Sequence, residues 1–440
     1  MASIQKRGDT YCITVSNGID CNGKRLRYTT TYQPDLTLSQ AKQKKEAEKY
    51  AADFERKIIN GLSMEADKLT FKEFAENWLS KVAEKNLEKT TFSKTQTYLD
   101  TKIYPYIGHL YLSKIKPYTI VQLYECLMEK GYVRNGKKYE YNHQTLKRIQ
   151  SVLNSVFKTA VQWDIMERNP CAEVSPPKKS DKMKKVKCFN ERQIRLFLEA
   201  LNQEYKAYCS EHDRVDDTGK PYHVRAYTTT HKLSLQFIVF FYVALFGGLR
   251  RGENISLTWE DIDFENNTIS INKSTAKIKN GQYIKEPKTE NSVREVTVPT
   301  EVIQLLRRLR AEQSTYRLSI GAEWEETLDE NGRPYHFVYT QANGKQMYID
   351  TPSQKFTKLI ADYNKTVENE EDKLPAITLH GLRHTMATVL IADGTEISTV
   401  SGRLGHADIS TTLDIYTHCL HERDQKAADA LEKYMLKKAK

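Results

Sequence analysis

The sequence predicts a multidomain protein that is mainly α-helical and carries small β-sheets. Apolar residues recur at helical spacing through much of the chain, as at Phe71, Phe74 and Trp78. Residues 1–35 instead alternate, and Asn22-Gly23 separates two strand-like runs, which is a strong hairpin signal. The stretch "SPPKKSDKMKKVKC", from Ser175 to Cys188, holds prolines and six lysines with almost no apolar content, which is typical of an exposed linker.

The composition argues against a membrane-spanning protein and favours a polyanionic partner. The 440 residues carry a formal net charge of +10 and have a mean hydropathy of −0.65. No apolar run reaches the ~18 residues of a membrane span. "LQFIVFFYVALFGG", from Leu235, is short enough to be a buried helix. The N-terminus lacks the apolar region of a signal peptide, so we expect a cytosolic protein. Seven cysteines without CxxC spacing indicate reduced thiols rather than a disulfide frame or a zinc site.

Residues 1–66 are predicted to form a sheet-plus-helix domain. The strands are followed by a polar helix, "TLSQAKQKKEAEKYAADFERKII". Lys24, Arg25 and Arg27 share one strand, and this leaves two interpretations open. The strand is either a solvated basic face or part of a sheet that presents cations to a DNA groove.

Residues 69–175 are predicted to be all-helical. Thr70 and Glu73 match a capping box that opens the first helix. Further helices are expected near 91–102, 118–129 and 142–163. The last of these places apolar residues on one side, namely Leu146, Ile149, Val152, Leu153, Val156 and Phe157.

Residues 176–188 are the basic linker, and residues 189–440 are predicted to form a mixed α+β domain. Either the linker lies along the phosphates of a nucleic acid, or it is only a soluble connection between domains. We expect a helix at 191–201, followed by a polar insert over 203–232 for which the sequence indicates no function. A buried helix then ends at "GGLRRGE", a strand turn lies at Asn266-Asn267, and strands flank "EPKTENSVREVTVP". The last third is helical and ends in a helical tail, "ERDQKAADALEKYMLKKAK".

Five short segments of this domain carry residues that could take part in catalysis. They are "GGLRRGE" at 247–253, "PKTENSVR" at 287–294, "HGLRH" at 380–384, "LGH" at 404–406, and Tyr416. His380 and His384 are four apart, which could indicate zinc. The glutamate of an HExxH motif is missing, however, and no third ligand is evident. His384 is better explained as a residue packed within its helix.

The same pieces suit phosphoryl transfer without a cluster of carboxylates. Two-metal enzymes need several Asp or Glu ligands, and none cluster here. Arginine forks grip non-bridging phosphate oxygens and neutralise the charge that grows there. A tyrosine phenol can attack phosphorus, and a lysine can protonate the departing oxygen. Taken one at a time, each of these residues is more often structural.

In this order, "GLRRGE", "PKT…R", "HGLRH", "LGH" and a tyrosine ten residues later resemble the tyrosine recombinase, or phage-type integrase, family. The resemblance spans Phe189 to His421 and extends to the upstream layout of integrases of phages and conjugative elements. It implies an arm-site DNA-binding domain at 1–66, a helical core-binding domain at 69–175 and a tyrosine recombinase catalytic domain at 189–440. The insert over 203–232 is longer than is usual in the family.

The resemblance also implies the role of each site residue. Arg250 and Arg383 would clamp the phosphate, and Glu253 would support them. His380 would manage the proton of the nucleophile, and the remaining positions complete the catalytic set: Arg250, Lys288, His380, Arg383, His406 and Tyr416. Lys288 would be the general acid, His406 would orient the phosphate, and Tyr416 would be the nucleophile on a short helix capped by Asp408.

A site-specific DNA recombinase is the implied function. It would integrate or excise a mobile element through a 3′-phosphotyrosyl intermediate, with no cofactor, metal or ATP. The implied partners are double-stranded DNA attachment sites and a homotetramer on DNA, and the family also uses an excisionase and a DNA-bending host protein; no membrane is involved. Two alternatives stay open. One is a type IB topoisomerase, and the other is a DNA-binding regulator with a helix-turn-helix in "TEISTVSGRLGHADISTTLDIY".

Overall fold

The computed structural model describes residues 2–19, 25–59, 64–134, 136–178, 187–216, 218–279, 281–285, 293–406, 408–410 and 412–413. The chain divides into two compact units, Met1–Met183 and Lys184–Lys440. Lys288, Tyr416, the Asn22-Gly23 turn, most of the linker and the C-terminal tail lie outside the described residues.

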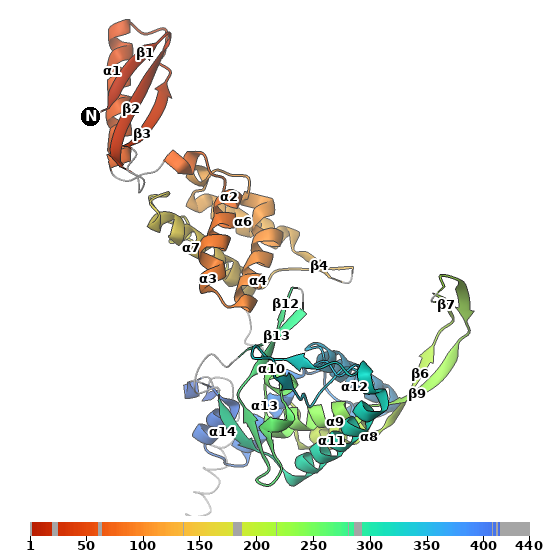
Figure 1. Cartoon of the computed structure of the whole chain (residues 1–440). Coiled ribbons are helices and arrows are strands. Elements are labelled where there is room, and N and C mark those ends of the chain that lie inside the picture. Colours follow the sequence, from red (N-terminus) through yellow and green to blue (C-terminus); the bar gives the residue numbers. More distant parts are fainter. Residues whose placement is uncertain are drawn as a thin grey trace, which may run out of the picture. The chain divides into compact units, whose positions relative to one another are not determined.

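The first unit opens with an antiparallel sheet covered on one face by a helix (Figure 1). The strands are β1 (Ser3–Arg7), β2 (Thr10–Ile19) and β3 (Arg25–Tyr32), in that order, and the helix is α1 (Gln40–Ile59). Because side chains alternate along a strand, Ile13 and Val15 share one face, and they pack against Ala51, Phe54 and Ile58. The predicted sheet-plus-helix unit is therefore present, with Arg25 and Arg27 exposed on β3.

A separate helical core follows in the same unit. The predicted capping box is present: the Thr70 amide donates to Glu73 Oε2 (2.9 Å), and the Glu73 amide donates to Thr70 Oγ1 (3.3 Å). It opens α2 (Phe71–Trp78). The remaining elements are α3 (Glu84–Asn86), α4 (Lys89–Tyr98), α5 (Tyr104–Ile107), α6 (Pro117–Lys130), β4 (Tyr132–Arg134), β5 (Lys137–Tyr139) and α7 (His143–Gln162).

The predicted helices of this core are confirmed with two differences. The helix expected at 91–102 begins at Lys89, and its last turn, Leu99–Ile103, widens to a π-helix. The prediction that residues 69–175 are all-helical was wrong at the hairpin of β4 and β5, whose short strands are mostly exposed and so bury no apolar face. All six apolar residues expected on the inner side of α7 are buried, namely Leu146, Ile149, Val152, Leu153, Val156 and Phe157.

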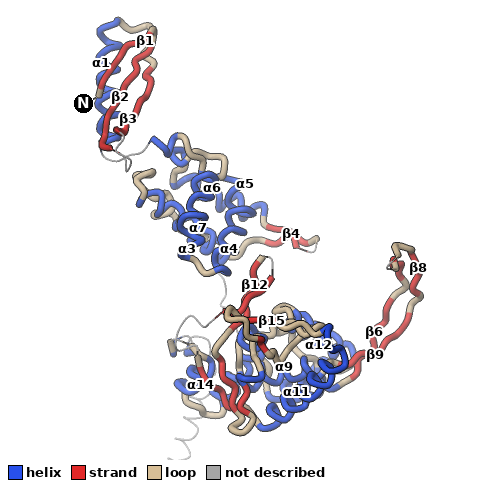
Figure 2. Tube along the Cα trace, in the orientation of Figure 1, coloured by secondary structure: helices blue, strands red, loops and turns tan. Residues whose placement is uncertain are grey.

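In the second unit, α8 (Glu191–Asn202) confirms the helix expected at 191–201. The polar insert then forms a long antiparallel ribbon that extends away from the body of the unit (Figures 1 and 2). Its strands are β6 (Glu204–Cys209) paired with β9 (Tyr227–Lys232), and β7 (His212–Val215) paired with β8 (Pro221–Val224). Tyr205 anchors the base of the ribbon, because its side chain is buried and its hydroxyl donates to the Ala200 carbonyl (2.6 Å).

The body of this unit mixes helices with small sheets around one large apolar core. The remaining helices are α9 (Leu235–Tyr242), α10 (Arg251–Ile255), α11 (Thr300–Ile320), α12 (Thr351–Thr366), α13 (His380–Ala392) and α14 (Ile397–Leu404). The strands are β10 (Ile262–Asp263), β11 (Thr268–Ile271), β12 (Ser274–Ile278), β13 (Gly281–Lys285), β14 (Arg294–Thr297), β15 (Thr327–Leu328) and β16 (Pro334–Tyr335). The turn expected at Asn266-Asn267 joins β10 to β11, with Asn267 at a φ of 55°. Over the part of the chain that is described, no helix combines the length and apolarity needed to cross a membrane.

Candidate active site

The first arginine is placed by a sharp turn after a buried helix. α9 continues through a wide turn at Val243–Gly247 to Gly248, whose φ of 66° lies in the left-handed region. A Cβ at Gly248 would lie 2.0 Å from Met386 Cε, the far end of a flexible side chain on α13, so the left-handed backbone is the main reason for glycine here. The chain then reverses into α10, with Arg250 as its N-cap residue.

Arg250 and Arg383 both donate to the backbone of residues 404–405, and Arg383 also donates to the turn at Gly248. Arg250 donates from Nη2 to the Gly405 carbonyl (3.0 Å), while Arg383 donates from Nη1 to the Gly248 carbonyl (2.7 Å) and from Nη2 to the Leu404 carbonyl. Arg383 is buried on α13, whereas the side chain of Arg250 is 39% exposed. One guanidinium therefore forms part of the floor of the site, and the other is accessible from solvent.

Glu253 fixes Arg250 but is itself neutralised from a second direction. Its carboxylate accepts from Arg250 Nη1 (2.7 Å) and from Arg294 Nη2 (2.8 Å), and only 7% of the Glu253 and Arg294 side chains is exposed. Burial raises the pKa of Glu253. The hydrogen bond from Arg294 and the charges of Arg294 and Arg250 outweigh burial and lower that pKa to about 2. The carboxylate is thus ionised at neutral pH and shared by two arginines.

Two histidines lie on the first turn and a half of α13. The rings of His380 and His384 meet edge to face, with centroids 4.7 Å apart. His380 is accessible to solvent, yet the pKa of its ring is lowered by partial burial and then by the charges of Arg383 and Arg250. Burial lowers the pKa of His384 to about 4. Both rings are therefore neutral at pH 7, and His380 is able to accept a proton.

His406 follows α14 across a left-handed glycine. Gly405 has a φ of 62°, and the His406 amide donates to the Ser401 carbonyl (3.2 Å). His406 Nδ1 lies 2.8 Å from the buried Thr412 Oγ1, so Thr412 engages only one of the two ring nitrogens. Burial, followed by the charges of Arg383 and Arg250, lowers the pKa of His406 to about 4. This ring is also neutral at pH 7.

Asp408 behaves as expected of a helix cap. Its Oδ1 accepts from the Ser410 amide (2.8 Å), and helical residues begin at Ile409. Tyr416, which was expected on this short helix, lies outside the described residues.

Four of the six predicted site residues are brought together, namely Arg250, His380, Arg383 and His406. The charges of Arg250 and Arg383 reach both histidines, as the lowered pKa values show. Lys288 belongs to a stretch that is not described, between β13 and β14. The segment "PKTENSVR" indicates no role for Arg294, and nothing in the sequence marks Thr412 as part of the site. A buried glutamate needs a cation, so the burial of Glu253 in the fold is the signal for Arg294.

The arrangement suits a tetrahedral oxyanion such as a phosphodiester. It offers guanidinium groups and neutral histidines, and the buried Glu253 carboxylate is paired with Arg250 and Arg294. Within the described ranges, no group of three His, Cys, Asp or Glu residues is placed to hold a metal ion.

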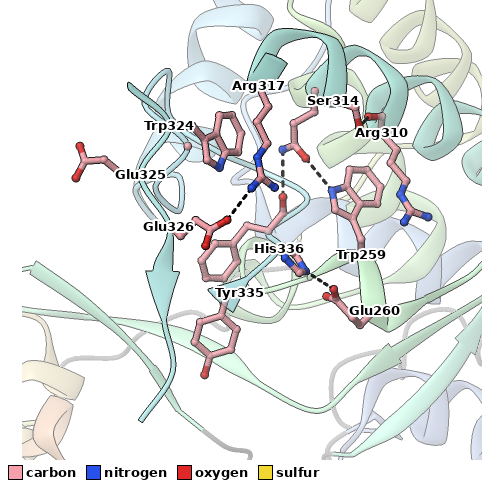
Figure 3. A pocket seen from close by; sticks show the side chains of 13 residues that line it. Trp259, Glu260, Arg310, Ser314, Arg317, Trp324, Glu325, Glu326, Tyr335 and His336 are labelled. Carbon is pink, nitrogen blue, oxygen red and sulfur yellow. Dashed lines mark hydrogen bonds and ion pairs between the residues drawn. The ribbon is translucent and has the colours of Figure 1, made fainter. Parts of the chain in front are cut away.

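A separate cavity of about 260 Å³ lies at the end of α11 (Figure 3). Trp259 and Trp324 contribute to its walls. Arg317 and Glu326 form an ion pair there (2.7 Å), and His336 Nδ1 lies 2.5 Å from Glu260 Oε1. The cavity is lined by other residues than those that converge around Arg250 and Arg383. The candidate active site is therefore a different part of this unit.

Comparison with protein families finds two matches along the chain. Residues 223–423 match the phage integrase family, and residues 71–176 match the phage integrase central domain. The first range contains all six predicted site residues, and the second lies within the helical part of the first unit.

The chain is also similar to individual proteins over nearly its whole length. It is 28% identical to a tyrosine recombinase XerC-like protein of Caldanaerobacter subterraneus over 96% of this chain and 95% of the relative. It is 27% identical to the ICEBs1 integrase of Bacillus subtilis over 96% of each. Among solved structures, the Tn1549 transposon integrase in complex with a circular intermediate DNA matches with a TM-score of 0.58. That match has 21% identity and covers 81% of this chain and 99% of the other, so it supports the fold.

Proposed function

Because the chain belongs to the phage integrase family of site-specific tyrosine recombinases, which cut and rejoin DNA, we propose that the residues around Arg250 and Arg383 form its catalytic site. The protein would act as the integrase of a mobile element, inserting or excising DNA at attachment sites. One observation carries the proposal. The carbonyls of residues 404–405 accept hydrogen bonds from both arginines, next to His380 and His406, while Glu253 pairs with both Arg250 and Arg294.

The proposed reaction has two balanced transesterifications. Tyr416 Oη forms a bond to the scissile phosphorus while the bond from phosphorus to the 5′ oxygen breaks, leaving a 3′-phosphotyrosyl link. His380 takes the phenolic proton, and Lys288 gives a proton to the departing 5′ oxygen. The 5′-hydroxyl of a partner strand then attacks the link and gives its proton to Lys288, the bond from phosphorus to Tyr416 Oη breaks, and His380 returns a proton to the phenolate. The phosphodiester energy is kept in the intermediate, so the steps need neither ATP nor a metal ion.

The arginines and His406 would act on the phosphate itself. Arg250 reaches it from the accessible side and Arg383 from the floor, and together they neutralise the charge that grows on the non-bridging oxygens. His406, fixed through Thr412, would orient the same phosphate with its second ring nitrogen. Positioned donors in a water-poor site are among the largest contributions to catalysis.

The proposal extends to partners and domain roles. Residues 1–66 would bind arm sites, residues 69–175 core sites, residues 176–188 would link the two parts, and residues 189–440 would hold the catalytic site. Four protomers would act on two duplexes in the cytoplasm, with an excisionase and a DNA-bending host protein setting the direction. The basic strand β3 and the net charge of +10 support a role for DNA phosphates in binding.

Two other functions predict different products from labelled DNA. A suicide duplex, nicked so that the freed 5′ end is lost, traps any covalent protein–DNA link. The integrase should form that link and should also join strands of two differently labelled duplexes. Relaxation of one duplex without joining would instead identify a type IB topoisomerase. Binding without any covalent link would identify a DNA-binding regulator.

A further inference from the structure

Arg294 has no role in the two proposed transesterifications, yet its side chain bonds to groups on two other elements. It is the first residue of β14, and its side chain is 7% exposed. Nη2 lies 2.8 Å from Glu253 Oε2 and Nη1 lies 3.4 Å from Glu253 Oε1, while Nε donates to the Arg403 carbonyl (2.9 Å). One guanidinium thus joins a carboxylate on α10 to the backbone of α14.

The link between β14 and α14 is reciprocal. Arg403 on α14 donates from Nη2 to the Thr297 carbonyl at the end of β14 (2.8 Å), while Arg294 at the start of β14 donates to the carbonyl of Arg403. Each element therefore sends an arginine to the backbone of the other. Two such bonds at opposite ends of a short strand fix its direction against the helix.

Arg294 also touches both groups that hold Arg250. Glu253 is the ion-pair partner of both arginines, and Gly405 is the residue whose carbonyl accepts from Arg250. A Cβ at Gly405 would lie 2.8 Å from Arg294 Nη1, so glycine lets the guanidinium lie directly against this turn. The turn leads into His406, and the stretch that carries Lys288 leads into β14.

We propose that Arg294 is a positioning residue for strand cleavage, which sets Glu253 and the 403–405 turn so that Arg250 and His406 face one phosphate. This inference rests on the proposed function. Arg294 acts through these neighbours and not on DNA, because its nitrogens face the carboxylate and the carbonyl. A misplacement of about 1 Å in such a supporting group can cost about 10²-fold in rate.

If Arg294 positions the site, its loss should change how the cleavage rate depends on pH. Loss of a merely structural ion pair would not. The charged or titratable groups that face Glu253 among the described residues are Arg250, Arg294 and His380. In the wild type the carboxylate stays ionised, because its pKa is about 2. Without Arg294, burial would raise that pKa with only Arg250 left to oppose it. As pH falls, Glu253 would take up a proton and release Arg250.

The test compares three full-length variants on the suicide duplex, with single-turnover cleavage measured across a range of pH. Arg294→Gln removes the charge and the forked donors. Arg294→Lys keeps one charge but cannot make all three bonds at once. Lys273→Gln is the matched control, because it removes the cation from another buried carboxylate, Asp261, that has no contact with Arg250. DNA affinity and thermal unfolding are measured for each protein.

We expect Arg294→Gln to cleave about 10²-fold more slowly than the wild type at pH 7, to lose further activity at lower pH, and to bind DNA with unchanged affinity. Arg294→Lys should recover part of the rate and show no added acid-side loss. If Arg294→Gln does not fold, Arg294→Lys decides, because its loss of rate must exceed that of Lys273→Gln. Cleavage by folded Arg294 variants at the control's rate and pH profile would overturn the inference. A wild type that forms no covalent link would instead overturn the proposed function.

Discussion

At the scale of single residues, the two arginines of the site differ in what surrounds them. Arg383 is buried and donates to the Gly248 and Leu404 carbonyls, so it holds the Gly248 and 404–405 turns together. Arg250 keeps 39% of its side chain exposed and is steered by Glu253. Loss of Arg383 should therefore disturb folding as well as chemistry, because buried carbonyls would lose their donor. Loss of Arg250 should affect chemistry more selectively.

The proposed general acid can be tested apart from the phosphate clamp. Lys288→Ala should cleave ordinary DNA slowly, because positioned proton donation is worth about 10² to 10⁴ in rate. A substrate with sulfur in place of the bridging 5′ oxygen loses a thiolate, which departs without that proton. The variant should then regain most of its cleavage rate, measured in single turnover on both substrates.

Two controls sharpen this comparison. Lys285→Ala, on the neighbouring strand β13, should cleave both substrates at close to the wild-type rate. Arg250→Ala should stay impaired on the sulfur substrate, because its charge acts on the non-bridging oxygens. Equal impairment of Lys288→Ala on the two substrates would remove Lys288 from the role and make Lys285 or a histidine the better candidate.

How far the site could be predicted depended on local spacing. His380 and Arg383 are three apart, and a helix places such residues on neighbouring positions of one turn, as α13 does. The convergence of Arg250 with His406 depends on contacts between distant segments, and only the family resemblance indicated it. Arg294 could not be assigned from the sequence, because a lone arginine at the start of a strand does not show which carboxylate it pairs with, and the burial of Glu253 is known only from the fold. Its value comes from Glu253 and Gly405, which are far from it in sequence.

At the scale of elements, apolar periodicity predicted those that bury a face. α7 matches within a residue at each end because Asn142 caps its start, accepting from the Thr145 amide (2.8 Å). The ribbon of β6 to β9 was not predicted as strands, because its residues are mostly polar and exposed, and so lack the alternating pattern of a half-buried strand. Its strands are instead defined by pairing along the whole insert.

At the scale of the whole molecule, the sheet of β1 to β3 has its own core with α1, apart from the helical core that follows. Because each of these two parts has its own apolar core, we expect each to have a separate role in DNA binding. A deletion of residues 1–66 should therefore leave cleavage of a short core site near the wild-type rate while recombination between full-length sites falls. The lost binding should be steeply salt-dependent, because cations such as Arg25 and Arg27 would contact phosphates.

Binding and recombination measured across salt concentrations test this division. The short core site is the internal control, since it lacks arm sequences. A truncated protein that recombines full-length sites with the wild-type rate and salt response would show that residues 1–66 do not bind arm sites.

If Tyr416 is the nucleophile, it becomes covalently joined to DNA, and the Tyr416→Phe variant tests this step. Phenylalanine keeps the ring and removes the attacking hydroxyl. Wild-type protein on a labelled suicide duplex should give a protein–DNA adduct that survives a denaturing gel. Tyr416→Phe should bind the same duplex with similar affinity and give no adduct. An undiminished adduct from Tyr416→Phe would show that Tyr416 is not the nucleophile.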